Sequence, residues 1–251
     1  MSNKDNKDIS RRDFLKTTGI ATGTLIGGGL IGGLIGYNSN KMAMPTKSPN
    51  TTNNTTNKTA QTSEGKMFFT TDKDFNIIAS ATERIFPKDD LGPGAIDLGV
   101  PYFIDRQLAG QYGSNSKEYM QGPFESGLPT QGYQSRLTRA EIFRQGIEKL
   151  DTEAEQRYKK SFTDISDQER DVILTAFQKD EVKMQGVTAS FFFNLLRSAT
   201  LEGAYSDPLY GGNRNMEGWK MKGFPGHQMS YINVIEKPEF QKIEPRSLGM
   251  H

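Results

Sequence analysis

The stretch from Glu202 to Gly226, EGAYSDPLYGGNRNMEGWKMKGFPG, constrains the fold more than any other part of the chain. It contains the only Trp and six of the 26 glycines, so neither a helix nor a strand is expected there. Glycine permits positive φ and close backbone approach, whereas Tyr205, Tyr210, Trp219 and Phe224 supply rigid contact area. A long loop in a compact domain is usually functional or disordered, and the aromatic residues argue against disorder. The stretch is therefore predicted to be an ordered, irregular arm.

Turn-forming residues are predicted to set the path of this arm. An Asp directly before a Pro commonly starts a turn by accepting backbone N–H bonds, as Asp207 would. Asn213, which follows a glycine, is a candidate for a left-handed backbone position. The residues predicted to structure the loop are Glu202, Asp207, Pro208, Gly211, Gly212, Gly223 and Gly226.

The arm is also where catalysis would be sought, because it gathers carboxyl groups. Glu202 and Asp207 lie five residues apart, and His227 follows the arm. Acid–base catalysis would need burial to raise the pKa of one carboxyl group. The chain has no G-x-G-x-x-G after a strand, no P-loop, no H-E-x-x-H and no G-x-S-x-G. We therefore predict no catalytic, cofactor-binding or metal-binding residues, and an enzyme using Glu202, Asp207 and His227 remains the alternative.

Composition narrows the function further. The chain has no Cys, which excludes disulfides, thiolate metal sites, a Cys nucleophile and covalent haem attachment. With two His, a multi-His metal site is not expected. The formal net charge of +1 gives no electrostatic reason to expect nucleic acid as a partner.

The N-terminal segment reads as an export signal. Ser10 to Lys16, SRRDFLK, resembles the twin-arginine motif, with Arg11, Arg12, Phe14 and Leu15 as its signal residues. An uncharged, glycine-rich run from Thr17 to Tyr37 follows, which is the arrangement of a secretory signal. A run of about 21 residues is also long enough for a transmembrane helix, but its many glycines disfavour one.

Three regions are predicted from these features. Residues 1–43 form the signal, which would act as a membrane tether if it were not cleaved. Residues 44–65 are rich in Asn and Thr and nearly without apolar side chains, so they are predicted to be a disordered linker. Residues 66–251 form one folded domain.

The domain is predicted to be mainly α, a small irregular helical domain with about five helices and long glycine- and proline-rich loops or arms. Apolar spacing and capping signals place helices after Thr71, at Pro101, from Ser135 or Thr138, after Ser166 and over 188–205. The fourth helix is expected to bury Val172, Ile173, Ala176 and Phe177. A second irregular arm covers 114–134, and the tail is predicted to be extended, with a brief β-like stretch at 231–235.

Aromatic, Met and Arg side chains on a glycine-rich scaffold are enriched in protein interfaces. The arm is therefore interpreted as a partner-binding surface, although the same side chains can instead pack on the domain's own helices. The residues predicted to bind a partner are Tyr205, Tyr210, Asn213, Arg214, Met216, Trp219 and Phe224.

Three blocks of the chain carry a resemblance. The segment from Thr200 to Gly226, with DPLYGGN, GW and GFPG, resembles the signature of the gluconate 2-dehydrogenase subunit 3 family. The segment from Gly122 to Ile147 is similar to the family's middle block, and the segment from Phe75 to Asp105 is similar to its opening helix and loop. The resemblance covers about Phe68 to Tyr231.

The resemblance implies an accessory role: a non-catalytic small (gamma) subunit of an exported, membrane-associated, FAD-dependent sugar or sugar-acid dehydrogenase. Such a subunit binds, stabilises and escorts a large flavoprotein of the glucose–methanol–choline type, which holds the FAD and lacks its own signal. The twin-arginine translocase and a cytochrome c subunit are further implied partners. The complex would lie at the outer face of the cytoplasmic membrane, in the cell wall or in the periplasm. A stand-alone exported oxidoreductase and a wall-associated binding module are the alternatives.

Overall fold

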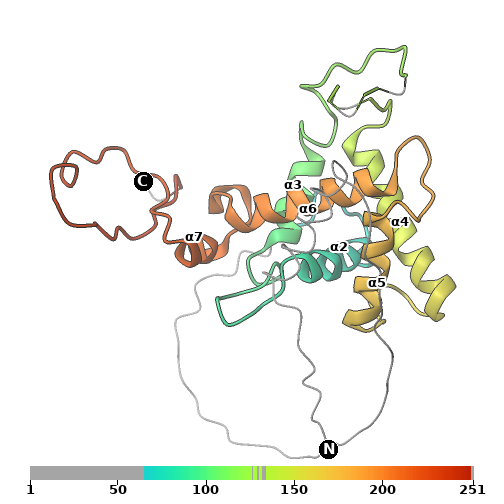
Figure 1. The fold of residues 1–251 in the computed structure, drawn as a ribbon, viewed down its shortest axis with the longest axis horizontal. Helices are drawn as coiled ribbons and strands as arrows, with labels where there is room; N and C mark the ends of the chain where they lie inside the picture. The colour runs from blue at the N-terminus through green and yellow to red at the C-terminus, as the bar shows by residue number, and fades with distance from the viewer. Residues whose placement is uncertain (1–64, 126, 129, 132–133, 250–251) are drawn as a thin grey trace, which may run out of the picture.

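The computed structural model describes residues 65–125, 127–128, 130–131 and 134–249. Within this part the chain forms six α-helices and no strands, which confirms the predicted mainly α fold (Figure 1). The helices are α2 (Asp72–Ile85), α3 (Val100–Ala109), α4 (Arg139–Tyr158), α5 (Asp167–Gln178), α6 (Ala189–Tyr205) and α7 (Glu217–Lys222). The predicted export signal and the linker up to residue 64 lie outside the described residues.

Side-chain caps explain where the helices begin. Thr71 caps α2 by accepting a hydrogen bond from the backbone N–H of Asp74 at 3.1 Å. Thr138 with Glu141 and Ser166 with Glu169 form capping boxes at the starts of α4 and α5. Each capping box satisfies two backbone N–H groups that the first helical turn leaves without partners.

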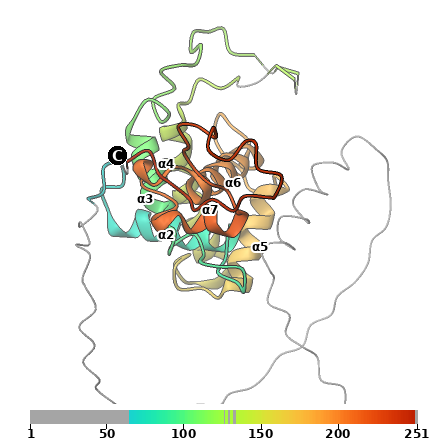
Figure 2. The ribbon, with the colours of Figure 1, turned by 90° about the vertical axis from the view of Figure 1, so that its left-hand side faces the viewer.

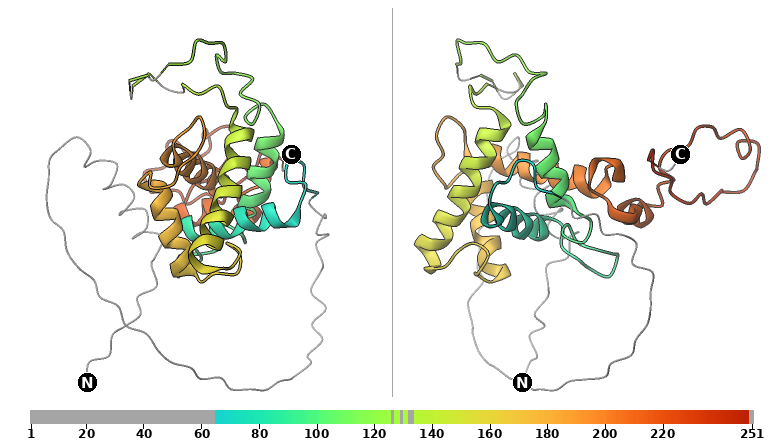
Figure 3. Two further views of the ribbon diagram at one scale, coloured as in Figure 1. Left: turned by 90° about the vertical axis from the view of Figure 1, so that its right-hand side faces the viewer. Right: turned by 180° about the vertical axis from the view of Figure 1, so that it is seen from behind.

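The core is built around α6, which contacts α2, α3, α4 and α5 (Figures 1 and 3). Phe192 of α6 meets the rings of Phe143 and Phe177 edge to face, at centroid distances of 5.6 and 5.7 Å. These contacts join α4, α5 and α6 through one fully buried aromatic cluster. An ion pair also joins α2 to α5, since Arg84 donates to both carboxylate oxygens of Asp171 at 2.9 Å.

One predicted core position is wrong. Val172 was expected to be buried, but 51% of it is exposed, and Leu174 is buried in its place. The buried face of α5 is centred between Ile173 and Phe177, and Val172 lies outside this face.

The chain enters the domain across α3. The carboxylate of Asp105 accepts hydrogen bonds from the backbone N–H groups of Met67, Phe68 and Phe69, at 2.6, 3.0 and 2.9 Å. Asp105 is fully buried, so these bonds compensate for the loss of water around its charge. Residues 67–69, which lie shortly before α2, are thereby fixed against the middle of α3.

Two irregular segments leave the helical body. The arm between α3 and α4 extends away from the helices, as predicted, and exposes Tyr119 and Leu128 (Figures 1 and 2). The tail after α7 forms a separate loop on the other side (Figure 1). The predicted β-like stretch in this tail is wrong, because the backbone N–H groups of Val234 and Ile235 both bond to the carbonyl oxygen of Tyr231 in a turn.

No helix in the described ranges combines the length and the apolar character that crossing a membrane requires.

Candidate interaction site

The segment from Glu202 to Gly226 continues directly from α6 and is more helical than predicted. Residues up to Tyr205 belong to α6, and two short 3-10 helices follow, η2 (Pro208–Tyr210) and η3 (Arg214–Met216). Glu217–Lys222 then forms α7, which ends at Gly223 with a φ of 62°. The expectation of no helix in this segment is therefore wrong, because its glycines allow close turns between short helices instead of preventing them.

Asn213 joins the end of α6 to the start of α7. It is fully buried and takes a left-handed conformation with a φ of 47°. Its side-chain Nδ2 donates to the carbonyl oxygen of Ser206 at 2.8 Å, and its Oδ1 accepts from the backbone N–H of Gly218 at 2.7 Å. Both ends of the amide thus bind this chain's own backbone.

Two glycines allow the segment to lie against the last turn of α6. A Cβ atom at Gly212 would overlap the carbonyl oxygen of Gly203, and one at Gly218 would overlap that of Ala204. Gly211, which ends η2, is also buried and lies against Arg106 of α3. The backbone therefore approaches α6 and α3 more closely than a larger residue would permit.

Trp219 also joins α7 to α6. Its indole Nε1 donates to the carbonyl oxygen of Tyr205 at 2.7 Å, and 6% of the residue is exposed. Its ring meets Phe224 edge to face at 5.4 Å and packs on Gly226. The indole is thus covered by this chain, and Trp219 supports the surface without forming part of it.

Asp207 connects the segment to the C-terminal tail. Its Oδ1 accepts from the backbone N–H of Leu209 at 2.9 Å, as expected for an Asp before a Pro, and from the hydroxyl of Ser247 at 2.6 Å. Its Oδ2 accepts from the backbone N–H of Leu248 at 2.8 Å. Although partial burial opposes ionisation, these donors and the nearby His227 hold the pKa of Asp207 below its ordinary value.

The segment exposes three large apolar side chains among its polar ones. Tyr210, Leu209 and Phe224 are exposed, at 49%, 57% and 49%. Beside Tyr210 lies a shallow depression of about 460 Å³, lined by Phe103, Gln107, Glu202, Tyr205, Ser206, Asp207 and Tyr210. The remaining predicted contact residues are half-buried: the ring of Tyr205 lies 5.8 Å from that of Phe86, and the Arg214 guanidinium lies over Tyr102 at 5.2 Å. Met216 precedes α7 and is also half-buried.

Glu202 and Asp207 both line this depression, but their carboxyl groups differ in environment. Partial burial raises the pKa of Glu202, and the positive charge of Arg139 opposes that shift. Asp207 uses its oxygens to hold η2 and the tail. His227 donates its backbone N–H to the carbonyl oxygen of Arg246 at 2.7 Å, and its ring Nε2 lies 3.2 Å from the sulfur of Met229. Three or more metal-binding side chains do not gather anywhere in the described part of the chain.

Sequence reasoning missed the tail contacts of Asp207 and the role of Asp105. The bond from Ser247 to Asp207 spans 40 residues and has no local signal. Asp105, in contrast, did carry a local signal in the sequence. It lies on the same helix face as the buried residues Pro101, Ile104 and Leu108, and an acidic side chain buried there needs hydrogen-bond donors.

The comparison with protein families matches nearly the same residues as the helical part of the structure. The family model described as gluconate 2-dehydrogenase subunit 3 matches residues 72–226, from the first residue of α2 to the turn after α7. No curated protein and no solved structure matches the chain.

Proposed function

The chain belongs to the gluconate 2-dehydrogenase subunit 3 family, and from this premise we propose that it is the non-catalytic small subunit of an exported, FAD-dependent sugar or sugar-acid dehydrogenase. Membership of a subunit 3 family implies a complex of several subunits. The match of residues 72–226, more than half of the chain, is the observation that carries the proposal. The FAD and the catalytic residues belong to a large subunit of the glucose–methanol–choline type.

The site geometry supports a binding role. The polar side chains of Asn213 and Asp207 are bonded to this chain's own backbone and tail. Tyr210 and Phe224 are exposed beside them on a support of short, closely packed helices. Rigid aromatic side chains on a fixed scaffold bind protein surfaces at low entropic cost.

The proposal includes export of the assembled complex. Arg11 and Arg12 would engage the twin-arginine translocase, and the large subunit, without a signal of its own, would be carried across the membrane with this chain. The complex would then act at the outer face of the cytoplasmic membrane, in the cell wall or in the periplasm. A cytochrome c subunit would accept the electrons where one is present.

The test is a double substitution, Arg11→Lys with Arg12→Lys, in cells that express this chain together with its large flavoprotein subunit. We expect both proteins to accumulate in the cytoplasm, measured by fractionation and by protein-bound flavin absorbance. Normal export of the flavoprotein in this variant would contradict the escort role. Turnover of a sugar acid by the purified chain without any flavoprotein would contradict the non-catalytic role.

A further inference from the structure

The tail forms a closed loop with fixed ends, which we call the C-terminal loop (residues 227–245). At its base, Gly226 and Arg246 form a parallel bridge, with His227 N–H bonded to the Arg246 carbonyl oxygen at 2.7 Å and Arg246 N–H to that of Pro225 at 3.1 Å. Directly after the loop, Ser247 and Leu248 are held by their hydrogen bonds to Asp207. The loop stands away from the helices in Figures 1 and 3, beyond α7.

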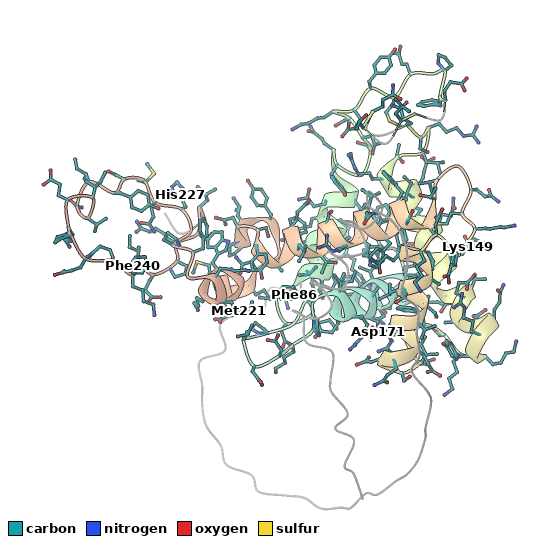
Figure 4. The ribbon with its side chains drawn as sticks, viewed as in Figure 1. Phe86, Lys149, Asp171, Met221, His227 and Phe240 are labelled. Atoms are coloured by element: carbon teal, nitrogen blue, oxygen red, sulfur yellow. The ribbon has the colours of Figure 1, made fainter. Side chains whose placement is uncertain are left out.

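The C-terminal loop exposes large apolar side chains. Phe240 is 93% exposed, and Figure 4 shows it on the loop, far from the core residue Phe86. Met229, Ile232 and Ile235 are 79%, 76% and 75% exposed. Phe224 and Leu248, at the base of the loop, are also exposed. Exposed apolar side chains gathered on one loop, unlike those scattered singly over a surface, are typical of an interaction site.

The charges of the loop favour a protein partner. Glu236, Glu239 and Glu244 alternate with Lys237, Lys242 and Arg246, so the loop and its closing residue carry three acidic and three basic groups. A segment that binds anionic lipid is rich in Lys and Arg, and this balance supplies no such attraction. Apolar side chains interspersed with mixed charges instead resemble the apolar core and polar rim of a protein interface.

A second copy of this chain offers a poor surface for the loop. One hollow of about 500 Å³, between α2 and α4, is lined by twelve residues, of which six are charged, such as Lys73, Arg144 and Glu148. The depression beside Tyr210 is shallow and lies at the base of the loop itself, because Asp207 lines it. Neither hollow is suited to receive Phe240 and the two isoleucines.

We propose that the C-terminal loop docks on the large subunit of the dehydrogenase complex, placing Ile232, Ile235 and Phe240 in an apolar groove of that protein. This inference rests on the proposed function. The family match ends at Gly226, so the loop would add a contact outside the part of the chain that the family model matches. The bridge between Gly226 and Arg246 and the buried Trp219 beneath it fix the direction in which the loop is presented.

The test compares two triple variants of the full chain, each co-expressed with the large FAD-dependent subunit. The loop variant is Ile232→Ser, Ile235→Ser and Phe240→Ser. The control is Met67→Ser, Leu91→Ser and Val172→Ser, three apolar residues that are exposed elsewhere on the domain. We expect the loop variant to bind the large subunit roughly 100-fold more weakly and the control less than about threefold more weakly, with unchanged melting temperatures.

The outcomes separate the two proposals. If the unmodified chain does not bind the large subunit, the proposed function fails. If it binds and the loop variant binds equally well, the loop inference alone fails. The loop inference is also overturned if the loop variant loses only self-association in sedimentation of the chain alone, or only binding to phosphatidylglycerol vesicles, while its affinity for the large subunit is unchanged.

Discussion

The indole Nε1 of Trp219 donates a hydrogen bond to the carbonyl oxygen of Tyr205, 2.7 Å away, at the C-terminal end of α6. The final carbonyl groups of a helix have no partners within the helix. Here side chains from the following segment supply them, because Asn213 also donates to the next carbonyl oxygen, that of Ser206. The hydrogen bonds that satisfy the last carbonyl groups of α6 therefore also hold the candidate site in place.

Two substitutions of Trp219 should destabilise the domain by different amounts. Trp219→Phe keeps most of the ring packing but leaves the Tyr205 carbonyl oxygen without its donor, and we expect a loss of about 1–2 kcal/mol in the free energy of unfolding. Trp219→Ala also removes the buried ring and should cost about 3–5 kcal/mol. Urea unfolding followed by far-UV circular dichroism measures both. A Trp219→Phe variant as stable as the unmodified chain would show that the hydrogen bond contributes nothing, and equal losses for the two variants would show that the ring packing adds nothing.

Asn213→Asp should produce a pH-dependent defect. One carboxylate oxygen can still accept from Gly218, but the other would face the carbonyl oxygen of Ser206, so the ionised form should cost about 2 kcal/mol or more. The introduced carboxyl would therefore have a raised pKa in the folded state. The deficit should be fully present above that pKa and absent below the unfolded-state value of about 3.9.

The matched control for this prediction is Asn213→Ala, which cannot regain a donor on protonation. Its deficit relative to the unmodified chain should remain as the pH falls. Parallel pH profiles of the two variants would argue against the assigned orientation of the Asn213 amide.

Gly218→Ala should displace α7, whereas Gly223→Ala should leave it in place. A Cβ at Gly218 meets the backbone of Ala204, so overpacking should cost about 1–3 kcal/mol. Gly223 has a φ of 62° but open space around it, so alanine there should add only backbone strain of about 1–2 kcal/mol. Emission of Trp219, the only Trp, reports the difference: a red shift is expected for Gly218→Ala alone. An unshifted spectrum for both variants would count against this packing.

Acid should release the C-terminal tail. The pKa of Asp207 is lower in the folded state than in the unfolded state, so its contribution to stability is present above about pH 3.9 and is lost as the pH falls through the folded-state pKa. The protection of the Leu248 amide against hydrogen exchange, relative to its intrinsic rate at each pH, should fall over that range. Asp207→Asn should weaken this pH dependence, because the amide side chain does not ionise there. An equally steep dependence in Asp207→Asn would assign the effect to another titrating group.

The local parts of the fold were predictable because their signals lie within a few residues. Thr71, Thr138 and Ser166 each stand before an apolar periodic segment, and each caps a helix. The strand-like pattern at 231–235 failed because a strand requires a partner, and no strand is present in the described part of the chain. The prediction that Val172 is buried was wrong because periodicity alone does not determine where the edge of a buried helix face lies.

The site was predictable in its location and less so in the direction of its side chains. The sequence identified Asn213, Asp207 and the glycines as residues that shape the arm, and the structure places each in a turn or close contact. It left open which aromatic residues face inward, because that depends on how α7 meets α6. Trp219 proves to be buried and Tyr210 exposed. The assignment of the exposed residues to a partner stays a prediction.

The Asp105 carboxylate determines how a pull on the N-terminal side would load the domain. Met67, Phe68 and Phe69 bond to one side chain in the middle of α3, so tension along the chain would have to break these three bonds before it reached α2. A pull on the leading end would thus be met first by the core helix α3, and α2 would keep its place until the Asp105 bonds were lost.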